Sequence, residues 1–345
     1  MPPKKEENTA LKQLKQSLKD HSLGSLYVLH GEEAYLRDYY LDKIKEQTLT
    51  PGLEEFNLHL IQGKDATPLT ISEAVDCLPM MSERTLVLVM DYDLFLAPEE
   101  QREELAALLS DLPEYVCLVF VYDLIEYKSD ARTKLAKVLK EKGLVVPFPH
   151  QSQGDLVDWI HRRFRALDRD IDSEQAKYLI FLCGDLMNTL AGEISKIAAY
   201  SQHTRITRAD IDAVAVPQLD AIVFQMTDAI LKRNFDRAAQ VLGDLYAQQE
   251  SPYRIHAALS KQLRQLYTAR LALEQHRDTQ YLMQLWGMKH HYPAENLMRA
   301  APRFELSWCR QAVSRAAQVD FAMKTSSGAE SDELLTAFLL ELAHG

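Results

Sequence analysis

Residues 77–91 read CLPMMSERTLVLVMD, and the second half of this stretch decides the fold. The run from Thr85 to Met90 is apolar and rich in β-branched side chains, and such a run predicts a strand buried on both faces of a parallel sheet. Pro79 fixes its own φ angle and lacks a backbone donor, so the strand cannot extend back through it. Met80 and Met81 therefore fall on a connection, where polar side chains are expected.

Further runs on either side of this strand place it in an alternating α/β pattern. Apolar strand-like segments occur at 25–30, 56–61, 115–122 and 144–148. Between the strands, residues 33–44, 98–112 and 129–142 have the spacing of amphipathic helices. Strands that alternate with helices favour a parallel sheet with helices on both faces, so we expect an α/β domain over residues 1–150.

After residue 150 the strand signal stops. Residues 151–217 predict a small domain of four short helices, the last capped by Thr207. Residues 218–345 are expected to form a third, helical domain, with helices at 220–232, 234–248, 251–277, 279–287, 303–324 and 332–343. Turns are expected at 249–252, 287–293 and 326–331.

Composition limits the function classes. The chain has 345 residues and a net charge of −11, and most of the acidic excess lies in the first 150 residues. This balance argues against a protein whose main task is to grip DNA alone. No apolar run reaches membrane-spanning length, and the polar, basic N-terminal tail lacks a signal sequence, so we expect a cytoplasmic protein with no membrane partner. Cys77, Cys117, Cys183 and Cys309 are expected to be buried thiols.

The sequence lacks the residues that nucleotide or metal chemistry requires. A phosphate-binding loop needs glycines and a lysine before a helix, whereas Gly31 is followed by Glu32 and Glu33, which would repel a triphosphate. We therefore expect no bound ATP or other cofactor. No histidine has metal-ligand spacing, and Asp91 is better explained as the end of a strand than as a metal ligand. No catalytic residue and no metal site are predicted.

Glu193 and Lys196 are spaced three residues apart on a predicted helix. We expect them to form a surface ion pair worth a few tenths of a kcal/mol, in preference to a functional pair.

Taken in order, several segments resemble the delta subunit family of bacterial DNA polymerase III clamp loaders. The matching segments are LYVLHGEEAYLRDYYLDKI (26–44), CLPMMSERTLVLV (77–89), KSDARTKLAKVLKEKGLVVPF (128–148), GDLMNTLAGEISKIAAYS with ITRADIDAV (184–214), 224–267 and VDFAMKTSSGAESDELLTAFLLELA (319–343). Each motif is weak alone, but their order spans nearly the whole chain.

This resemblance implies an AAA+-like first domain, a lid-like second domain and a third domain that joins an oligomeric collar. It also implies a subunit with no catalytic site of its own, because polymerase activity and ATP hydrolysis reside in other subunits. The implied partners are the sliding clamp (beta), the ATPase subunits (gamma/tau), delta-prime and primer–template DNA. The implied task is to bind and open the clamp.

The resemblance also assigns a role to the connection before residue 85. In the family a Leu-Phe pair at this place is an apolar wedge that enters a pocket on the clamp. The matching clamp-binding residues are Pro79, Met80 and Met81, and the departure from Leu-Phe puts the tightness of the contact in doubt. Methionine suits an adaptable binding surface. The alternative is that both methionines fold back onto their own domain.

Two other functions stay open on the sequence. One is an AAA+-type ATPase with a degenerate phosphate loop, which nucleotide binding by the purified chain would reveal. The other is a helical protein-interaction scaffold that binds neither a clamp nor ATPase subunits.

Overall fold

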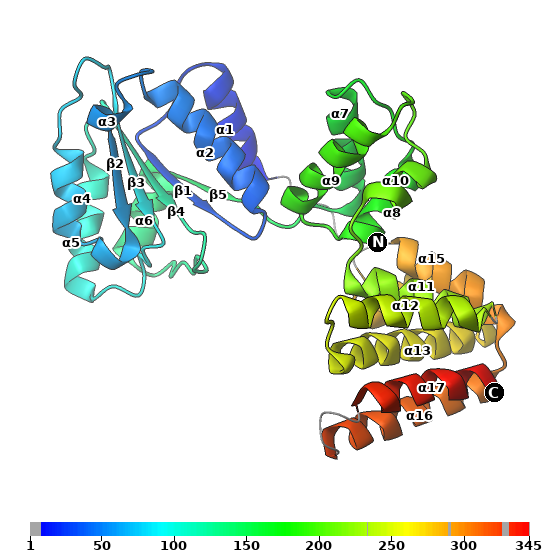
Figure 1. Cartoon of the computed structure of the whole chain (residues 1–345). Coiled ribbons are helices and arrows are strands. Elements are labelled where there is room, and N and C mark those ends of the chain that lie inside the picture. Colours follow the sequence, from blue (N-terminus) through cyan, green and yellow to red (C-terminus); the bar gives the residue numbers. More distant parts are fainter. Residues whose placement is uncertain (1–7, 233, 289–290, 326–330, 345) are drawn as a thin grey trace. The chain divides into compact units, whose positions relative to one another are not determined.

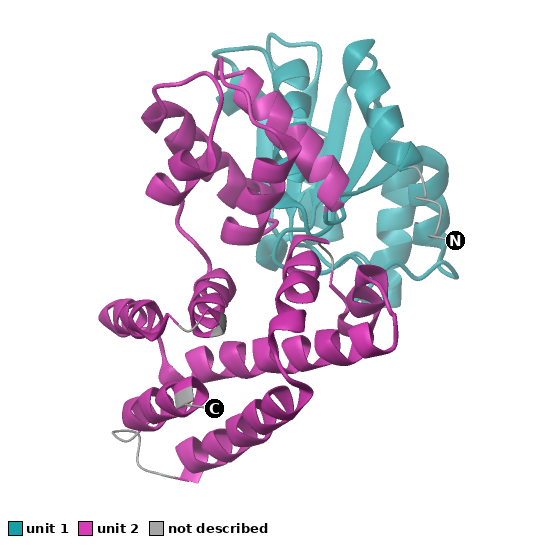
Figure 2. Cartoon of the chain, turned by 90° about the vertical axis from the view of Figure 1, so that its right-hand side faces the viewer, with its two compact units in different colours: residues 1–150 teal, residues 151–345 magenta. Residues whose placement is uncertain are grey.

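The computed structural model describes residues 8–232, 234–288, 291–325 and 331–344. The chain divides into two compact units, residues 1–150 and residues 151–345, which Figure 2 shows in different colours. We refer to them as the α/β unit and the helical unit. A further division of the helical unit at residue 217 stays a prediction.

Five parallel strands form the sheet of the α/β unit, in the order β2-β3-β4-β1-β5 (Figure 1). Their bounds are β1 Leu26–His30, β2 Leu58–Gln62, β3 Thr85–Met90, β4 Val116–Val121 and β5 Leu144–Pro147. In β3, Leu88 is in register with Leu60 of β2 and Val119 of β4. All five predicted strands are confirmed, because each was marked by a run of apolar residues long enough for a buried strand.

Helices cover both faces of this sheet. Successive residues of β1 enter different cores, since Val28 packs with one buried cluster and Leu29 with the other. The cluster around Val28 includes side chains of α4, α5 and α6, and the cluster around Leu29 includes side chains of α1 and α2. The helix bounds are α1 Thr9–Lys19, α2 Ala34–Thr48, α3 Glu54–Asn57, α4 Pro68–Val75, α5 Glu99–Ser110 and α6 Lys134–Lys142, with a short 3₁₀ turn, η1, at Gly63–Asp65.

The N-terminal stretch is more structured than expected. Residues 9–19 form α1, where the sequence suggested only a polar tail. The Asn8 side chain caps this helix by accepting a hydrogen bond from the Leu11 amide at 2.9 Å. Leu14 is fully buried in the core. The expectation of a tail was wrong because the apolar face of this helix is only a few residues wide.

One of the four thiols is not buried. Cys117, Cys183 and Cys309 lie in the interior, whereas Cys77 is exposed just after the end of α4. Its thiol donates a hydrogen bond to the Glu73 carbonyl at 3.2 Å. The prediction of burial was wrong for Cys77 because the chain leaves the core at Asp76, where α4 ends.

The helical unit begins with the four short helices that the sequence predicts. Their bounds are α7 Gln153–Arg165, α8 Ser173–Cys183, α9 Met187–Tyr200 and α10 Arg208–Val214. Thr207 caps α10 as expected, because its side chain accepts a hydrogen bond from the Asp210 amide and the Asp210 carboxylate accepts one from the Thr207 amide.

The remaining helices pack around α13 (Pro252–Glu274). Its first half contributes Ile255 and Leu259 to one buried cluster, and its second half contributes Leu266 and Ala269 to another. The other helices are α11 Leu219–Leu231, α12 Phe235–Ala247, α14 Thr279–Trp286, α15 His291–Ala300, α16 Leu306–Thr325 and α17 Ser331–His344 (Figure 1).

The sequence did not predict α15. The expected turn begins correctly at Gly287, which ends α14 in the left-handed conformation at φ +60°. A helix then starts at His291, with Pro293 in its first turn, where a missing amide hydrogen does no harm. Residues 289–290 and most of the expected 326–331 turn lie outside the described residues. Within the ranges that the structure does describe, none of the helices is both long enough and apolar enough to cross a membrane.

Candidate functional site

The predicted site residues lie on the connection between α4 and β3, which we call the α4–β3 loop (residues 76–84). The preceding helix starts at a capping box formed by Thr67 and Thr70 and ends at Asp76. Pro79 then prevents either α4 or β3 from extending through the loop. The loop therefore lies beside the amino-terminal end of β3, which begins at Thr85.

Three apolar side chains of this loop are exposed. The exposed fraction is 72% for Leu78, 55% for Met80 and 86% for Met81, while Pro79 is partly buried. The methionines therefore do not fold back onto their own domain, which was the alternative left open by the sequence. Single exposed apolar residues are common on protein surfaces, whereas here three lie within four consecutive residues.

A buried asparagine holds the backbone of the loop at Met80. The Asn57 side chain, which is 0% exposed, donates to the Met80 carbonyl at 3.0 Å and accepts from the Met80 amide at 2.7 Å. Its amide group also donates to the Leu53 carbonyl at 3.1 Å. Because a buried amide group is costly to leave unpaired, these three bonds fix the position of Met80 on the domain.

The rest of the loop is also tied to the domain. Met81 has a φ angle of +52°, a conformation that costs a residue with a side chain about 1 kcal/mol or more. The Ser82 and Thr50 hydroxyls lie 3.1 Å apart. The Arg84 guanidinium donates to three carbonyls, those of Leu23, Gly24 and Val116, at 2.8–2.9 Å. The exposed side chains therefore project from a defined backbone.

The sequence located the methionines but missed two residues of this site. Leu78 adjoins Pro79, and its apolar character was the available signal. Asn57 gave no signal, because it lies 23 residues before Met80 and reaches it only through the fold. Further exposed apolar side chains lie on α3, β2 and α4: Phe56, Leu60 and Leu69, respectively.

The other end of the sheet is where a phosphate-binding loop would lie, after β1. Gly31 has a φ angle of +120°, and a Cβ atom on it would come within 2.4 Å of the Phe148 carbonyl oxygen. The Glu33 amide donates to that same carbonyl at 2.9 Å, and the Glu33 side chain is 2% exposed. Glu32 is paired with His150 at 3.1 Å. This turn is packed against Phe148, the residue after β5, and it places carboxylates where phosphates would need donors.

Charged side chains form hydrogen bonds with the residues that follow β4, and one of these side chains, Asp91, directly follows β3. Arg37, 3% exposed, donates to the Tyr122 carbonyl at 3.0 Å and to the Asp123 carboxylate at 2.5 Å. The Asp91 carboxylate accepts hydrogen bonds from the amides of residues 123, 124 and 125. Asp91 thus organises the connection after β4, although Leu124 on that connection is exposed. Within the described residues, no group of three or more His, Cys, Asp or Glu side chains is arranged to hold a metal ion.

Nearby, burial lowers the pKa of His30, the last residue of β1. Its ring lies 4.5 Å from that of Tyr127, measured between centroids. Because burial favours its neutral form, we interpret His30 as a residue that packs against Tyr127 at this end of the sheet.

The Glu193–Lys196 pair differs from expectation. The two side chains are joined at 2.8 Å, but the Glu193 side chain is only 9% exposed. Its second oxygen accepts a hydrogen bond from the Val216 amide at 3.2 Å. The prediction of a surface pair was wrong, because Glu193 ties α9 to the segment that follows α10.

A five-stranded parallel α/β domain followed by a unit made of packed helices defines the class of this protein by its architecture. Comparisons with known proteins identify the family. The family model for "DNA polymerase III, delta subunit" matches residues 27–148, and the model for its C-terminal domain matches residues 220–342. The chain belongs to the DNA polymerase III delta subunit family.

The sequence is similar to those of known delta subunits over most of the chain. It is 26% identical to DNA polymerase III subunit delta of Bacillus subtilis over 334 residues, 95% of each protein. It is 23% identical to the probable DNA polymerase III subunit delta of Aquifex aeolicus, covering 77% of each. The solved structure of the Bacillus subtilis DNA clamp loader delta protein (YqeN) matches 97% of this chain and 100% of that one, at 24% identity and a TM-score of 0.58.

Proposed function

We propose that this chain is the delta subunit of a clamp loader, that it binds the sliding clamp (beta) and opens one interface of the ring, and that it does not hydrolyse ATP. Opening the ring allows it to be loaded onto primed DNA during replication. The observation that carries the proposal is the α4–β3 loop, whose exposed Met80 and Met81 project from a backbone held by Asn57.

The chemistry of the loop suits an apolar pocket on a protein partner. Leu78, Met80 and Met81 are unbranched at Cβ and have several rotatable bonds, so they adapt to the shape of a pocket. The fixed backbone reduces the entropy lost on binding, since only side chains need to be ordered. Together with Pro79, these residues form the proposed clamp contact.

The turn after β1 supports the absence of nucleotide binding. Gly31 is in close contact with the Phe148 backbone, and Glu32 and Glu33 repel anions at this place. In this proposal partner subunits bind and hydrolyse the ATP, and polymerase activity resides in yet another subunit. We expect no saturable micromolar binding of a labelled ATP analogue to the isolated chain, and such binding would favour the degenerate ATPase instead.

Assembly with gamma/tau and delta-prime is assigned to the helices after residue 217. An apolar groove of about 240 Å³ lies between α12 and α17, lined by side chains that include Phe235, Leu242 and Leu339. On α16, Phe321 is 70% exposed. Apolar surface of this kind suits contact with neighbouring subunits. We place the assembled complex in the cytoplasm, where its nucleic-acid partner is primer–template DNA.

A pull-down with the sliding clamp of the same organism tests the central claim. The full-length chain, immobilised through its C-terminus, is expected to retain the clamp in the absence of ATP and of the other subunits. The matched control is the chain with both Met80→Ser and Met81→Ser. Equal retention by the two chains would reject the loop as the contact, and no retention by either would reject clamp binding by the lone chain.

A further inference from the structure

The helical unit contains a hollow of about 370 Å³ whose character differs from that of the α4–β3 loop. Its walls come from α8, the first turns of α11, the middle of α13, the end of α14 and α15. Gln218, Gln262 and Gln265 line it, and we call it the glutamine pocket. Sites for small molecules usually measure roughly 300–1,000 Å³ and often lie between packed helices, so this hollow is large enough to hold a ligand.

Aromatic and aliphatic side chains form one part of the wall. Phe181 of α8 and Phe224 of α11 pack edge to face there, with ring centroids 5.2 Å apart. Ile180 and Leu297 line the pocket as well, and both are buried. Because these side chains are held by contacts with their neighbours, the wall is preformed and loses little freedom when a ligand binds.

The glutamine amides of α13 are nearly buried in the pocket wall. Gln262 is 7% exposed and Gln265 is 8% exposed. The amide nitrogen of Gln262 donates to the Asp220 carbonyl at 2.9 Å, but its oxygen, Oε1, has no hydrogen-bond partner within the described residues. A buried carbonyl without a partner lowers stability, and a donor on a ligand would relieve that cost.

Trp286, the last residue of α14, adds a donor to this acceptor. Its side chain is partly buried, and its indole N–H group, Nε1, also lacks a partner in the parts of the chain that the structure describes. Both Nε1 and Gln262 Oε1 are shielded from solvent, so a ligand reaches them when the indole ring or the glutamine side chain turns slightly. The wall therefore holds an unpaired donor and an unpaired acceptor.

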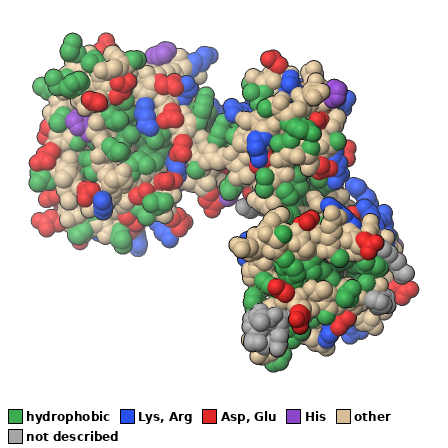
Figure 3. Space-filling model, in the orientation of Figure 1, with side chains coloured by type: hydrophobic (Ala, Val, Ile, Leu, Met, Phe, Trp, Pro, Cys, Tyr) green, Lys and Arg blue, Asp and Glu red, His purple; other side chains and the backbone are tan. Residues whose placement is uncertain are grey.

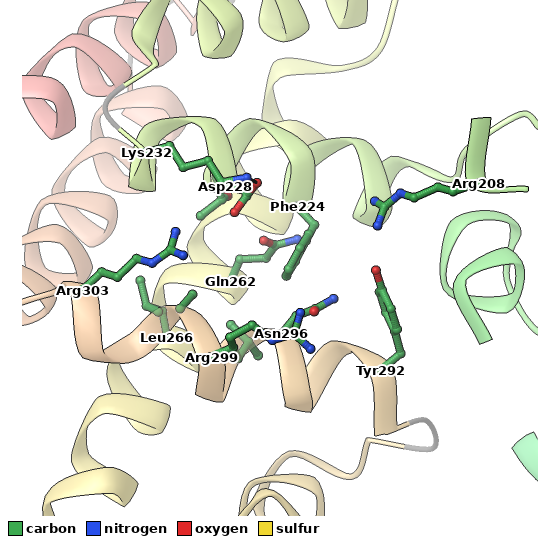
Figure 4. A pocket seen from close by; sticks show the side chains of 13 residues that line it. Arg208, Phe224, Asp228, Lys232, Gln262, Leu266, Tyr292, Asn296, Arg299 and Arg303 are labelled. Atoms are coloured by element: carbon green, nitrogen blue, oxygen red, sulfur yellow. Dashed lines mark hydrogen bonds and ion pairs between the residues drawn. The ribbon is translucent and has the colours of Figure 1, made fainter. Parts of the chain in front are cut away.

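The charged groups at the pocket are already engaged. Among the described residues that line it, Lys261 is the only cation, and its ammonium lies 2.6 Å from the Asp220 carboxylate. Asp185 also has an interaction partner. Figure 3 shows acidic and basic side chains mixed over the visible face of the helical unit. The neighbouring hollow in Figure 4 shares Gln262 and Phe224 with the glutamine pocket but has several arginines in its wall.

We propose that the glutamine pocket binds a small neutral molecule that carries an amide or lactam group on a planar ring. The N–H of that group donates to Gln262 Oε1, and its carbonyl accepts from Trp286 Nε1. The ring of the ligand lies against Phe181 and Phe224. A hydrocarbon would leave both polar atoms unpaired, and an anion would meet no free cation in the wall. This inference concerns another unit of the chain than the proposed clamp contact, and it stands if that contact is disproved.

The test uses the full chain labelled with 5-fluorotryptophan, and benzamide as the probe. Of the three tryptophans, Trp286 lines the pocket and Trp159 and Trp308 do not. We expect benzamide to shift the fluorine resonance of Trp286 saturably, with a dissociation constant on the order of 1 mM for so small a ligand. The resonances of the other two should stay in place, and Trp286→Phe assigns the three signals. Shifts of all three, or the absence of a saturable shift, would overturn the proposal.

Two variants remove the polar atoms of the wall. Gln262→Leu removes the acceptor, and Trp286→Phe removes the donor while it keeps a ring. We expect each to weaken benzamide binding at least fivefold, as measured by saturation-transfer NMR of the ligand. Gln175→Leu is the matched control, because Gln175 Oε1 is also buried and unpaired in the described chain but does not line the pocket, and we expect less than a twofold loss. Equal losses in the two glutamine variants would contradict the assignment. Melting temperatures show whether each variant is folded.

Two further ligands test the chemical class on the unaltered chain. Acetophenone keeps the ring and the carbonyl of benzamide but has no N–H, and benzoate carries a carboxylate in place of the amide. We expect both to bind at least fivefold more weakly than benzamide. Equal binding of acetophenone would show that the amide N–H is not recognised, and tighter binding of benzoate would assign the pocket to anions. Either result would overturn the proposal.

Discussion

At the amino-terminal end of β3 the α/β unit exposes flexible apolar side chains. At the carboxyl-terminal ends of β1, β3 and β4, charged side chains such as Arg37 and Asp91 form hydrogen bonds and ion pairs within the chain. Met81 is 86% exposed at the first end, and Arg37 is 3% exposed at the second. In an open α/β sheet, ligands usually bind at the carboxyl-terminal ends of the strands. Here the charged groups at that end are engaged in contacts within the chain, although Leu96 and Leu124 are exposed on the connections that follow β3 and β4, and the proposed contact lies at the opposite end.

The comparison teaches that the two ends of one sheet can be put to different uses. The contacts made by Gly31, Glu33 and Arg37 contribute to the stability of the domain, and those of the α4–β3 loop leave side chains free for binding. Substitutions at the two ends should therefore affect different measurements, and four predictions test this.

The largest expected effect is on clamp affinity at the exposed end. Replacing Met80 and Met81 together with Ser should weaken clamp binding about a hundredfold. This loss corresponds to about 2.7 kcal/mol for the pair, because contributions of neighbouring side chains seated in a pocket, about 2 kcal/mol each, are not additive. The melting temperature should stay within about 1–2 °C, since exposed side chains contribute little to their own domain. Titration of labelled clamp and a thermal melt on the same variant measure both. A large fall in melting temperature with unchanged affinity would show that the two methionines stabilise their own domain and do not contact the clamp.

At the carboxyl-terminal end of the sheet, Gly31→Ala should lower the free energy of unfolding by about 2 kcal/mol or more. The new Cβ atom would meet the Phe148 carbonyl oxygen at 2.4 Å, in a conformation that side chains rarely adopt. Gly52→Ala is the matched control, because Gly52 also has a positive φ but its Cβ atom would meet nothing within 4 Å. Urea unfolding should show the larger loss for Gly31→Ala. Equal losses would mean that the packing against Phe148 contributes nothing.

Asn57 links the fold to the exposed end, and Asn57→Ala should reduce both stability and clamp affinity. Loss of its hydrogen bonds should cost about 1–3 kcal/mol in unfolding free energy. A less ordered loop should weaken clamp binding about tenfold in the fraction that stays folded. In the background of Met80→Ser and Met81→Ser, the same change should cause no further loss of affinity. An additive loss there would show that Asn57 does not act through the methionines.

The smallest expected effect is a pH dependence at the carboxyl-terminal end of the sheet. Burial lowers the pKa of His30 in the folded chain, so the unfolded chain binds its proton more readily. The stability contributed by neutral His30 is therefore complete above the unfolded pKa, about 6.5, and is lost as the pH falls through the folded value. His30→Gln should flatten the unfolding free energy between pH 7 and pH 5, while clamp affinity at pH 7.5 should not change. A steeper pH dependence in the variant would contradict this sign.

Much of the fold follows from local sequence patterns. The five strands and most helices were predictable because each buries enough apolar residues in one periodic run. Residues 9–19, 68–75 and 291–300 were not predicted as helices, since the first and the last have narrow apolar faces, Pro293 suggested a turn, and 68–75 is only eight residues long. Burial of Glu193 was also beyond prediction, because its partner, the Val216 amide, is brought near only by tertiary packing.

The candidate site was likewise predictable only in part. The exposure of Met80 and Met81 followed from Pro79 and from a family resemblance. The hydrogen bonds from Asn57 to the Met80 backbone could not be inferred, because an asparagine next to a strand has many possible partners.

The exposed thiol of Cys77 makes the α4–β3 loop accessible to chemistry. Burial raises the pKa of Cys117 to about 11, of Cys183 to about 12 and of Cys309 to about 11, so these thiols have little reactive thiolate near neutral pH. A maleimide dye should therefore modify Cys77 first, three residues before Met80. The chain thus carries a natural attachment point for a spectroscopic reporter beside its proposed contact, and slower labelling in the presence of the clamp would serve as a footprint without any engineered cysteine.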